Sequence, residues 1–212
     1  FRVVGEVYYK ALSNMIPYVI DNVRIRYLPE YRSRGYATGI DLKMNGQFVP
    51  DAESWVSISI MQTREDIEGD FYNIYLNSDG DTINSASINN VAVDSIRIEP
   101  GYIPRPADQR VNVSLFFQDY LPNNPSYKMH LSLVFGTGLP FGPPNSDKYK
   151  QTLRMPPYRR VDIGFSKQLV GYQNPDKPAK VPRNLKFIRN AWLSLEIFNL
   201  LNINNTVSYI WV

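Results

Sequence analysis

The sequence predicts an all-β protein, an antiparallel up-and-down meander whose strands form part of a transmembrane β-barrel. Long runs of the chain alternate apolar and polar residues with a period of two, which is the period of a strand with two different faces. No segment shows a convincing helical period. Most of the runs are about ten to thirteen residues long, which suits a tilted membrane-spanning strand better than the roughly five or six residues usual in soluble sheets.

The composition is compatible with this fold class. Hydrophobic residues make up 43% of the 212 residues, the mean hydropathy is -0.32, and no apolar run approaches the length of a membrane helix. Strands of a membrane barrel alternate lipid-facing and lumen-facing residues. Because they are only half apolar, their average hydropathy resembles that of a soluble protein.

Charge and cysteine content exclude several classes of function. The 23 basic and 20 acidic residues are interspersed and leave a net charge of +3, without the basic block that marks a nucleic-acid-binding face. Cysteine is absent, which excludes disulfides, thiolate nucleophiles and thiolate metal ligands. Nucleic acid is therefore not an expected partner.

The first strand is expected over residues 1–12 and shows the two faces most simply. Val7 and Tyr9 lie on its apolar face and Glu6 on its polar face, and a short turn follows at Ser13-Asn14. Seven further strands are expected at residues 17–28, 36–48, from 55 to about 66, 109–120, 127–136, 158–168 and 190–205.

The last of these strands, residues 190–205, is the one for which a helix is a competing interpretation. A two-residue period places Leu195 and its apolar neighbours on one face and Glu196 on the other. Helical spacing would instead group Glu196 with Trp192 and Leu200 on one side, without a clean polar stripe. The pattern therefore favours the strand.

The connections between the expected strands differ in length. Short turns are expected near Pro50 and at residues 121–126, whereas residues 67–107, 139–157 and 171–189 are long connections, the first with room for a small hairpin. Most long loops thus gather at one end of the sheet, as they do in outer-membrane barrels. A soluble β-sandwich would also show alternation, because it buries one face of each sheet. Strand length is what favours the barrel.

Six charged residues fall on the expected polar faces of the strands: Arg24, Arg26, Asp41, Lys43, Asp162 and Glu196. In a barrel these side chains would face the lumen. They would either pair with one another or with an internal domain, or contact a substrate. Both readings remain open from the sequence.

Three motifs have residue types found in chemical sites, but their sequence context favours structural roles. His130 is the single histidine, so no His-based triad or multi-histidine metal site can form. Gly136-Thr137-Gly138 lacks the Gly-Lys-Ser/Thr ending of a phosphate-binding loop and is expected to be a strand end entering a turn. Asn77, Asp79 and Asp81 offer oxygen ligands, but the glycine at the sixth position of a calcium loop is missing.

A group of carboxylates comes at the end of the fourth expected strand, at Glu65, Asp66, Glu68 and Asp70. Two of them could be imagined as an acid/base pair, yet carboxylates clustered beside a loop are expected to be solvated. With no nucleophile, metal or acid/base constellation, the sequence predicts no enzyme, no catalytic residues, no cofactor and no metal.

Six motifs, taken in order, resemble the C-terminal barrel portion of TonB-dependent outer-membrane receptors over essentially all of the chain. They are Gly-Tyr-Ala-Thr-Gly-Ile-Asp at residues 35–41, Trp-Val-Ser-Ile-Ser at 55–59, Pro-Arg-Pro-Ala-Asp-Gln-Arg at 104–110, Gly-Thr-Gly-Leu-Pro-Phe-Gly-Pro-Pro at 136–144, Tyr-Arg-Arg-Val-Asp at 158–162 and Glu-Ile-Phe-Asn-Leu-Leu at 196–201.

The resemblance implies a parent barrel of about 22 strands, plugged by an N-terminal domain. Residues 1–212 would supply about eight of those strands as one partial barrel domain, without the plug and without the closing strand. The parent would be an active transporter in the outer membrane of a Gram-negative cell. Its implied partners are outer-membrane lipid, a scarce small nutrient, and the TonB energy-transducing complex, which would act through the plug.

Two alternatives remain beside this reading. A complete eight-stranded outer-membrane barrel with a structural or adhesion role would require pairing between the first and eighth strands. A soluble glycan-binding β-sandwich would require a second sheet packed on the apolar face.

Overall fold

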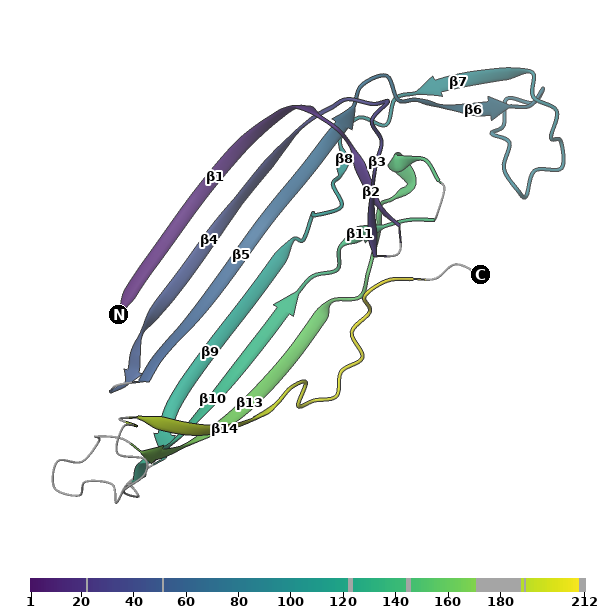
Figure 1. Ribbon diagram of the computed structural model, residues 1–212. Coiled ribbons are helices and arrows are strands. Elements are labelled where there is room, and N and C mark those ends of the chain that lie inside the picture. The colour runs from purple at the N-terminus through teal and green to yellow at the C-terminus, as the bar shows by residue number, and fades with distance from the viewer. Residues whose placement is uncertain are drawn as a thin grey trace.

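The protein is represented by a computed structural model that describes residues 1–21, 23–50, 52–121, 124–143, 146–170, 188 and 190–209. These residues form one antiparallel sheet with smaller hairpins attached to it (Figure 1). The described residues contain no α-helix, and one short 3₁₀ helix, η1, spans Lys148–Lys150. The prediction of an all-β antiparallel meander is confirmed.

The main sheet contains seven strands that follow one another in chain order, with an eighth short strand beside them. The seven are β1 (Arg2–Met15), β4 (Ser33–Val49), β5 (Ala52–Ile67), β9 (Val111–Leu121), β10 (Asn124–Gly136), β13 (Tyr158–Val170) and β14 (Ala191–Ile197). The eighth, β8 (Ile103–Pro104), pairs with the end of β5. In Figure 1 the strands lie side by side in a single curved layer.

The strand register gathers the apolar side chains on one face of the sheet. One row of paired residues is Val7, Ile40, Ile60 and Val111, and a second row is Val56, Leu115, Leu133 and Val161. Residues directly opposite one another share a face, and side chains alternate along each strand. Both rows therefore belong to the same face, which we call the apolar face.

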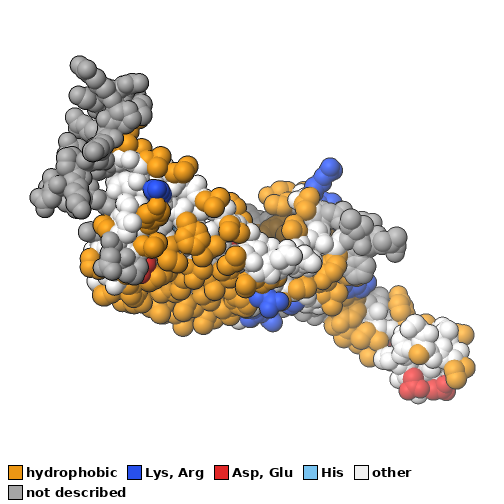
Figure 2. All heavy atoms as spheres, turned by 90° about the horizontal axis from the view of Figure 1, so that it is seen from below, with side chains coloured by type: hydrophobic (Ala, Val, Ile, Leu, Met, Phe, Trp, Pro, Cys, Tyr) orange, Lys and Arg blue, Asp and Glu red, His pale blue; other side chains and the backbone are white. Residues whose placement is uncertain are grey.

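The apolar face is largely uncovered. The side chains of Val7, Ile60 and Leu195 are 78%, 55% and 66% exposed, and Figure 2 shows hydrophobic side chains over much of the surface in that view. The buried hydrophobic residues of the described chain are Val19, Ala52, Ile67 and Ile103, none from the middle of a main strand. The apolar surface of the sheet is thus not used to build a core between two layers.

Connections at the two ends of the sheet are unequal. At one end β4 stops at Val49 and β5 starts at Ala52, while β9 stops at Leu121 and β10 starts at Asn124. The other end, which we call the long-connection end, carries three hairpins: β2 (Tyr18–Asp21) with β3 (Arg24–Tyr27), β6 (Tyr72–Leu76) with β7 (Asp94–Ile98), and β11 (Pro140–Phe141) with β12 (Leu153–Arg154). The expected connection at residues 171–189 lies, except for residue 188, outside the described residues.

The prediction of a main-sheet strand at residues 17–28 is wrong. These residues form the separate β2–β3 hairpin, in which Tyr18 pairs with Tyr27 and the Leu28 amide donates to the Pro17 carbonyl oxygen at 2.9 Å. A two-residue period is the same in one long strand and in two short strands joined by a turn. The sequence pattern therefore could not separate the two.

The turn expected at Ser13-Asn14 is a bulge within β1. The strand continues to Met15, the pairing with β4 shifts between Leu12 and Met15, and Asn14 has a φ of 50°. An extra residue in one strand of an antiparallel pair bends that strand and leaves the pairing to resume beyond it.

The final strand is shorter than predicted, because it ends at Ile197 and not near residue 205. Asn199 adopts a φ of 52°, in the left-handed region that asparagine tolerates better than most residues. The Leu200 amide then donates to the Val161 carbonyl oxygen at 2.7 Å. The chain after β14 therefore continues along β13, with hydrogen bonds to Val161 and Arg159 in place of regular strand pairing.

Neither alternative architecture is formed by the described residues. β1 and β14 are the two edges of the main sheet and do not pair with each other, and the other sheets are two-stranded hairpins. No closed eight-stranded barrel and no two-sheet sandwich is present in this part of the chain. Among the same residues, no helix is long and apolar enough to cross a membrane.

Candidate binding site

The Glu65 carboxylate is buried where β5 reaches the long-connection end. Its Oε1 lies 3.2 Å from Nζ of Lys148 and its Oε2 lies 3.6 Å from Nε of Arg105. The hydroxyl of Ser33 donates to Oε2 at 3.4 Å. Glu65 has no exposed surface. One carboxylate thus joins β5 to the start of β4, to the segment after β8 and to η1.

Lys148 reaches this carboxylate from η1. Its side chain is only 5% exposed, and its ammonium group also donates to the Tyr18 carbonyl oxygen at the start of β2. Burial lowers the pKa of Lys148, and the charge of Glu65 acts in the opposite direction. Because each buried charge compensates for the other, the pair fastens η1 and the β2–β3 hairpin to the end of the sheet.

A second buried carboxylate, that of Asp108, fastens the segment that enters β9. Its Oδ1 accepts a hydrogen bond from the Thr63 amide of β5 at 2.7 Å. Its Oδ2 lies 2.9 Å from Nε of Arg110 and is also paired with Arg154 of β12. An ionised carboxylate can only accept, and here charged and backbone donors surround it. Asp108 thus links β5, β12 and the segment that leads into β9.

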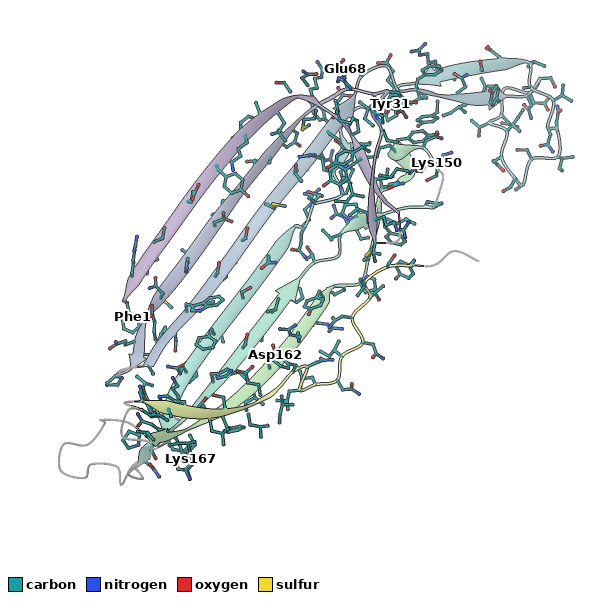
Figure 3. The ribbon with its side chains drawn as sticks, in the orientation of Figure 1. Phe1, Tyr31, Glu68, Lys150, Asp162 and Lys167 are labelled. Atoms are coloured by element: carbon teal, nitrogen blue, oxygen red, sulfur yellow. The ribbon has the colours of Figure 1, made fainter. Side chains whose placement is uncertain are left out.

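A cleft of about 460 Å³ opens beside Lys148, between the β2–β3 hairpin, the turn after β5 and the segment that leads into η1. Its walls combine aromatic rings with carboxylates: Tyr31, Phe71 and Tyr149, and Glu30, Asp70 and Asp147. Figure 3 places Tyr31, Glu68 and Lys150 together at this end of the sheet, with Phe1 and Lys167 at the other. The volume lies in the range of about 300–1,000 Å³ typical of small-molecule sites.

The carboxylates of the cleft differ in what they contact. Oδ2 of Asp70 is buried and has no hydrogen-bond partner among the described residues. Burial raises the pKa of the Asp70 carboxyl, and the charges of Asp66 and Glu99 raise it further. Asp147, in contrast, lies 3.0 Å from Nζ of Lys150, and this hydrogen bond lowers the pKa of its carboxyl.

The charged residues predicted to face a lumen fall into two groups. Asp41, Lys43, Asp162 and Glu196 lie on the face of the main sheet opposite the apolar face, on β4, β13 and β14. Arg24 and Arg26 do not, because they belong to the β2–β3 hairpin. Arg26 instead lines the cleft. The structure therefore does not bring the six residues into one cluster.

Asp41 and Lys43 line a polar groove of about 530 Å³ on the sheet, together with Arg2 and Glu6 of β1. The Ser59 hydroxyl of β5 donates to Oδ1 of Asp41. These contacts join neighbouring strands on the polar face and fit the reading in which the charges of that face are balanced within the sheet.

Asp162 has a positioning role that the sequence did not reveal. Its Oδ2 lies 2.8 Å from Nη2 of Arg160, and its Oδ1 accepts a hydrogen bond from the Asn199 amide at 2.8 Å. The Asn199 side chain in turn exchanges hydrogen bonds with the backbone of Ile203. Asp162 thus holds the segment after β14 against β13.

The remaining motifs have structural roles. His130 lies on the polar face beside Phe116, with ring centres 5.5 Å apart, and its ring fills the space above Gly164, where a Cβ atom would lie 2.1 Å from Cε1 of the ring. β10 ends at Gly136, so the prediction that Gly136-Thr137-Gly138 is a strand end is confirmed.

The Asn77 side chain organises a turn. Its Oδ1 accepts hydrogen bonds from the amides of Asp79 and Asp81, at 3.0 Å and 2.9 Å. That oxygen is therefore already engaged by the backbone. Within the described residues, no three His, Cys, Asp or Glu side chains form a group that could hold a metal ion.

The expectation that Glu65 is solvated is wrong, because β5 extends to Ile67 and the long connections cover its end. Glu65 has the same parity along β5 as Ser59 and Thr63, which places it on the polar face. That parity was readable in the sequence. Its partners Arg105 and Lys148 lie 40 and 83 positions further on, and nothing local in the sequence connects them with it.

No family model, no curated protein and no solved structure matches the chain. The resemblance to TonB-dependent receptors therefore stays a prediction from the six motifs.

Replacing Lys148 by Met should loosen the long-connection end, because it leaves Glu65 buried without its closest cation. Removing one partner of a buried pair costs about 3–5 kcal/mol. We expect a lower melting temperature of the full-length protein and faster proteolysis in residues 137–157. The matched control is Lys150→Met, since the Lys150–Asp147 pair is exposed and such pairs contribute about 0–1 kcal/mol. Equal proteolysis of the two variants would contradict the assigned role of Lys148.

Replacing Asp162 by Ala should release the segment after β14. The Asn199 amide loses its acceptor, and hydrogen bonds to charged groups contribute roughly 1.5–3 kcal/mol, so its hydrogen exchange should accelerate at least about tenfold. Mass spectrometry of peptides covering residues 198–205 measures this. Glu196→Ala is the control, because Glu196 lies on the same face and pairs with Gly164. Unchanged protection at Asn199 would rule out the Asp162 contact as the anchor.

Proposed function

We propose that the chain forms part of the wall of an outer-membrane transport barrel of the TonB-dependent receptor type, which imports a small nutrient across the outer membrane of a Gram-negative cell. The observation that carries the proposal is the continuous apolar face. It crosses seven strands, is covered by no second sheet among the described residues, and lies opposite a face that carries Asp41, Asp162 and other polar residues.

Lipid is the environment that suits this face. In the hydrocarbon region every backbone amide and carbonyl must be paired inside the protein, and a continuous sheet satisfies that demand along its strands. Residues that alternate between an apolar outer face and a polar inner face are what a barrel wall around an aqueous lumen requires. A soluble sheet with the same pattern would have to bury Val7 and Leu195 under a second layer.

The long-connection end is proposed as the outer, ligand-receiving end of the barrel. Outer-membrane barrels have short turns on the periplasmic side and longer loops outside. The described turns between β4 and β5 and between β9 and β10 are short, and the three hairpins and the cleft gather at the opposite end. Glu65 fastens η1 and the segment after β8 to the end of the sheet, and Asp108 fastens β12 there. Import would be energised by the TonB complex acting on a plug inside the barrel.

Arginine substitutions on the two faces of β10 test the membrane assignment. Leu133→Arg places a charge on the proposed lipid face, at a cost of about 2–4 kcal/mol near the bilayer midplane. Ser132→Arg places it on the lumen face, opposite Asp162. We expect Leu133→Arg to lower the amount of heat-modifiable, membrane-inserted protein several-fold and Ser132→Arg to leave it nearly unchanged. Equal yields of the two variants would contradict the assignment of the faces.

Transport can be tested without knowing the nutrient. Cells that express the full-length protein are incubated in a complex medium, and mass spectrometry follows which small molecules disappear, against cells with an empty vector. We expect at least one compound to be depleted only in expressing cells, and its depletion to stop when an uncoupler collapses the proton gradient. Depletion that survives the uncoupler, or no specific depletion, would count against energised import.

A further inference from the structure

The apolar face carries charged residues only near its two ends, within the described parts of the seven main strands. At the end with the short turns they are Asp119 and Lys167, and at the long-connection end they are Arg34, Arg64, Asp66 and Arg159. Between these positions every strand presents only uncharged residues to this face, most of them aliphatic. The apolar face is thus a band with two borders.

Aromatic rings mark the same two borders. At the long-connection end Tyr9 of β1 stacks on Tyr36 of β4, with ring centres 6.1 Å apart. At the opposite end Phe1 packs edge-on against Phe48, with ring centres 4.8 Å apart. Aromatic rings that flank an aliphatic band are typical of proteins whose apolar surface meets lipid, because rings favour the interface between hydrocarbon and water.

β13 carries one cation at each border. Arg159 and Lys167 both lie exposed on the apolar face, and the three residues between them on that face are apolar. The Lys167 ammonium lies 5.1 Å from the centre of the Tyr127 ring on the neighbouring strand β10. Long cationic side chains at such a border can keep their stems on apolar surface and place their charge at lipid headgroups.

The borders run obliquely across the strands. Leu42 of β4 and Arg159 of β13 belong to one row of paired residues, which passes through Ile58, Val113 and Phe135. On β13 this row is the border itself. On β4 it lies midway between the aromatic borders at positions 36 and 48. Strands of a membrane barrel are tilted, so a level membrane plane must cross neighbouring strands at shifted positions.

The height of the band agrees with a bilayer. From Tyr36 to Phe48 the border-to-border distance on β4 is twelve residues, and from Arg159 to Lys167 on β13 it is eight. At about 3.4 Å per residue and a tilt of about 40°, these lengths span roughly 31 and 21 Å. They lie on either side of the apolar band of about 25 Å that outer-membrane barrels present.

We propose that the two interfaces of a lipid bilayer cross the sheet along these borders, with Arg159 at the phosphate groups of one leaflet and Lys167 at those of the other. Lipid chains cover the band between them. The proposal rests on the barrel-wall function proposed above and locates the contact with its lipid partner residue by residue. Its test measures depth, so a misplaced border can be told from a wrong environment.

Spin labels on single cysteines measure this depth in the full-length protein, inserted into phospholipid vesicles. Residues 1–212 contain no cysteine, and any cysteine elsewhere is replaced by serine. Electron paramagnetic resonance compares collisions of the label with oxygen, which concentrates in lipid, and with a nickel complex, which stays in water. The variants on β13 are Arg159→Cys, Ile163→Cys and Lys167→Cys, and a heat-modifiability gel checks that each has inserted.

We expect the label at position 163 to lie about 10 Å deeper than the labels at 159 and 167, because it is at the middle of a band of about 25 Å. The outer two labels should lie at the phosphate level. A label at 167 as deep as that at 163 would refute the border while leaving the lipid face intact. Contact with water at all three positions would overturn both this proposal and the barrel-wall function.

Leu42→Cys on β4 tests the oblique course of the borders independently of the β13 variants. Although Leu42 and Arg159 share one row, we expect the label at 42 near the bilayer centre and the label at 159 at the phosphate level. Equal depths would refute the oblique borders. Ser132→Cys is the control on the opposite face of β10, where the nickel complex should reach the label. A lipid-like signal there would contradict the assignment of the faces.

Discussion

The register of the main sheet is the constraint on which the other features depend. Side chains alternate with a period of two, so a slip of one residue in any strand pair would move the apolar residues of that strand to the polar face. Leu115 pairs with both Val56 and Leu133, so the register places apolar residues opposite one another across three strands. Hydrogen bonds to the flanking strands and a common apolar face therefore specify the same alignment.

Charge is distributed differently at the long-connection end. Along the strands, Lys43 and Glu196 remain exposed on the polar face, whereas Glu65 and Asp108 are fully buried at the long-connection end. Such pairs contribute less net stability than their geometry suggests, because both partners lose hydration. These buried ion pairs mainly fix the positions of the connections. A connection held by a buried charge has few alternative positions, and this places Lys148 and its neighbours around the cleft.

The sequence predicted the β-strands of the main sheet better than it predicted the cleft. Alternation depends on residues two positions apart, and it identified the faces on which Asp162 and Glu196 lie. It could not tell one long strand from the β2–β3 hairpin, so Arg26 was assigned to the sheet. The buried pairs depend on residues far apart in the chain, such as Glu65 and Lys148, and local pattern carries no signal for them. Turn signals were also ambiguous, because an asparagine with positive φ, such as Asn14, occurs in β-bulges as well as in turns.

The unequal connections have a consequence for the order in which the sheet forms. β4 with β5 and β9 with β10 are each joined by a tight turn, so these hairpins pair residues that are close in the chain and need little loop closure. Pairing β5 with β9 must first close the connection formed by residues 68–110. Because the entropic cost of closure grows only with the logarithm of loop length, this connection can be long without preventing assembly. Two locally formed hairpins would then join into one sheet, and the β5–β9 pairing would be the slow step.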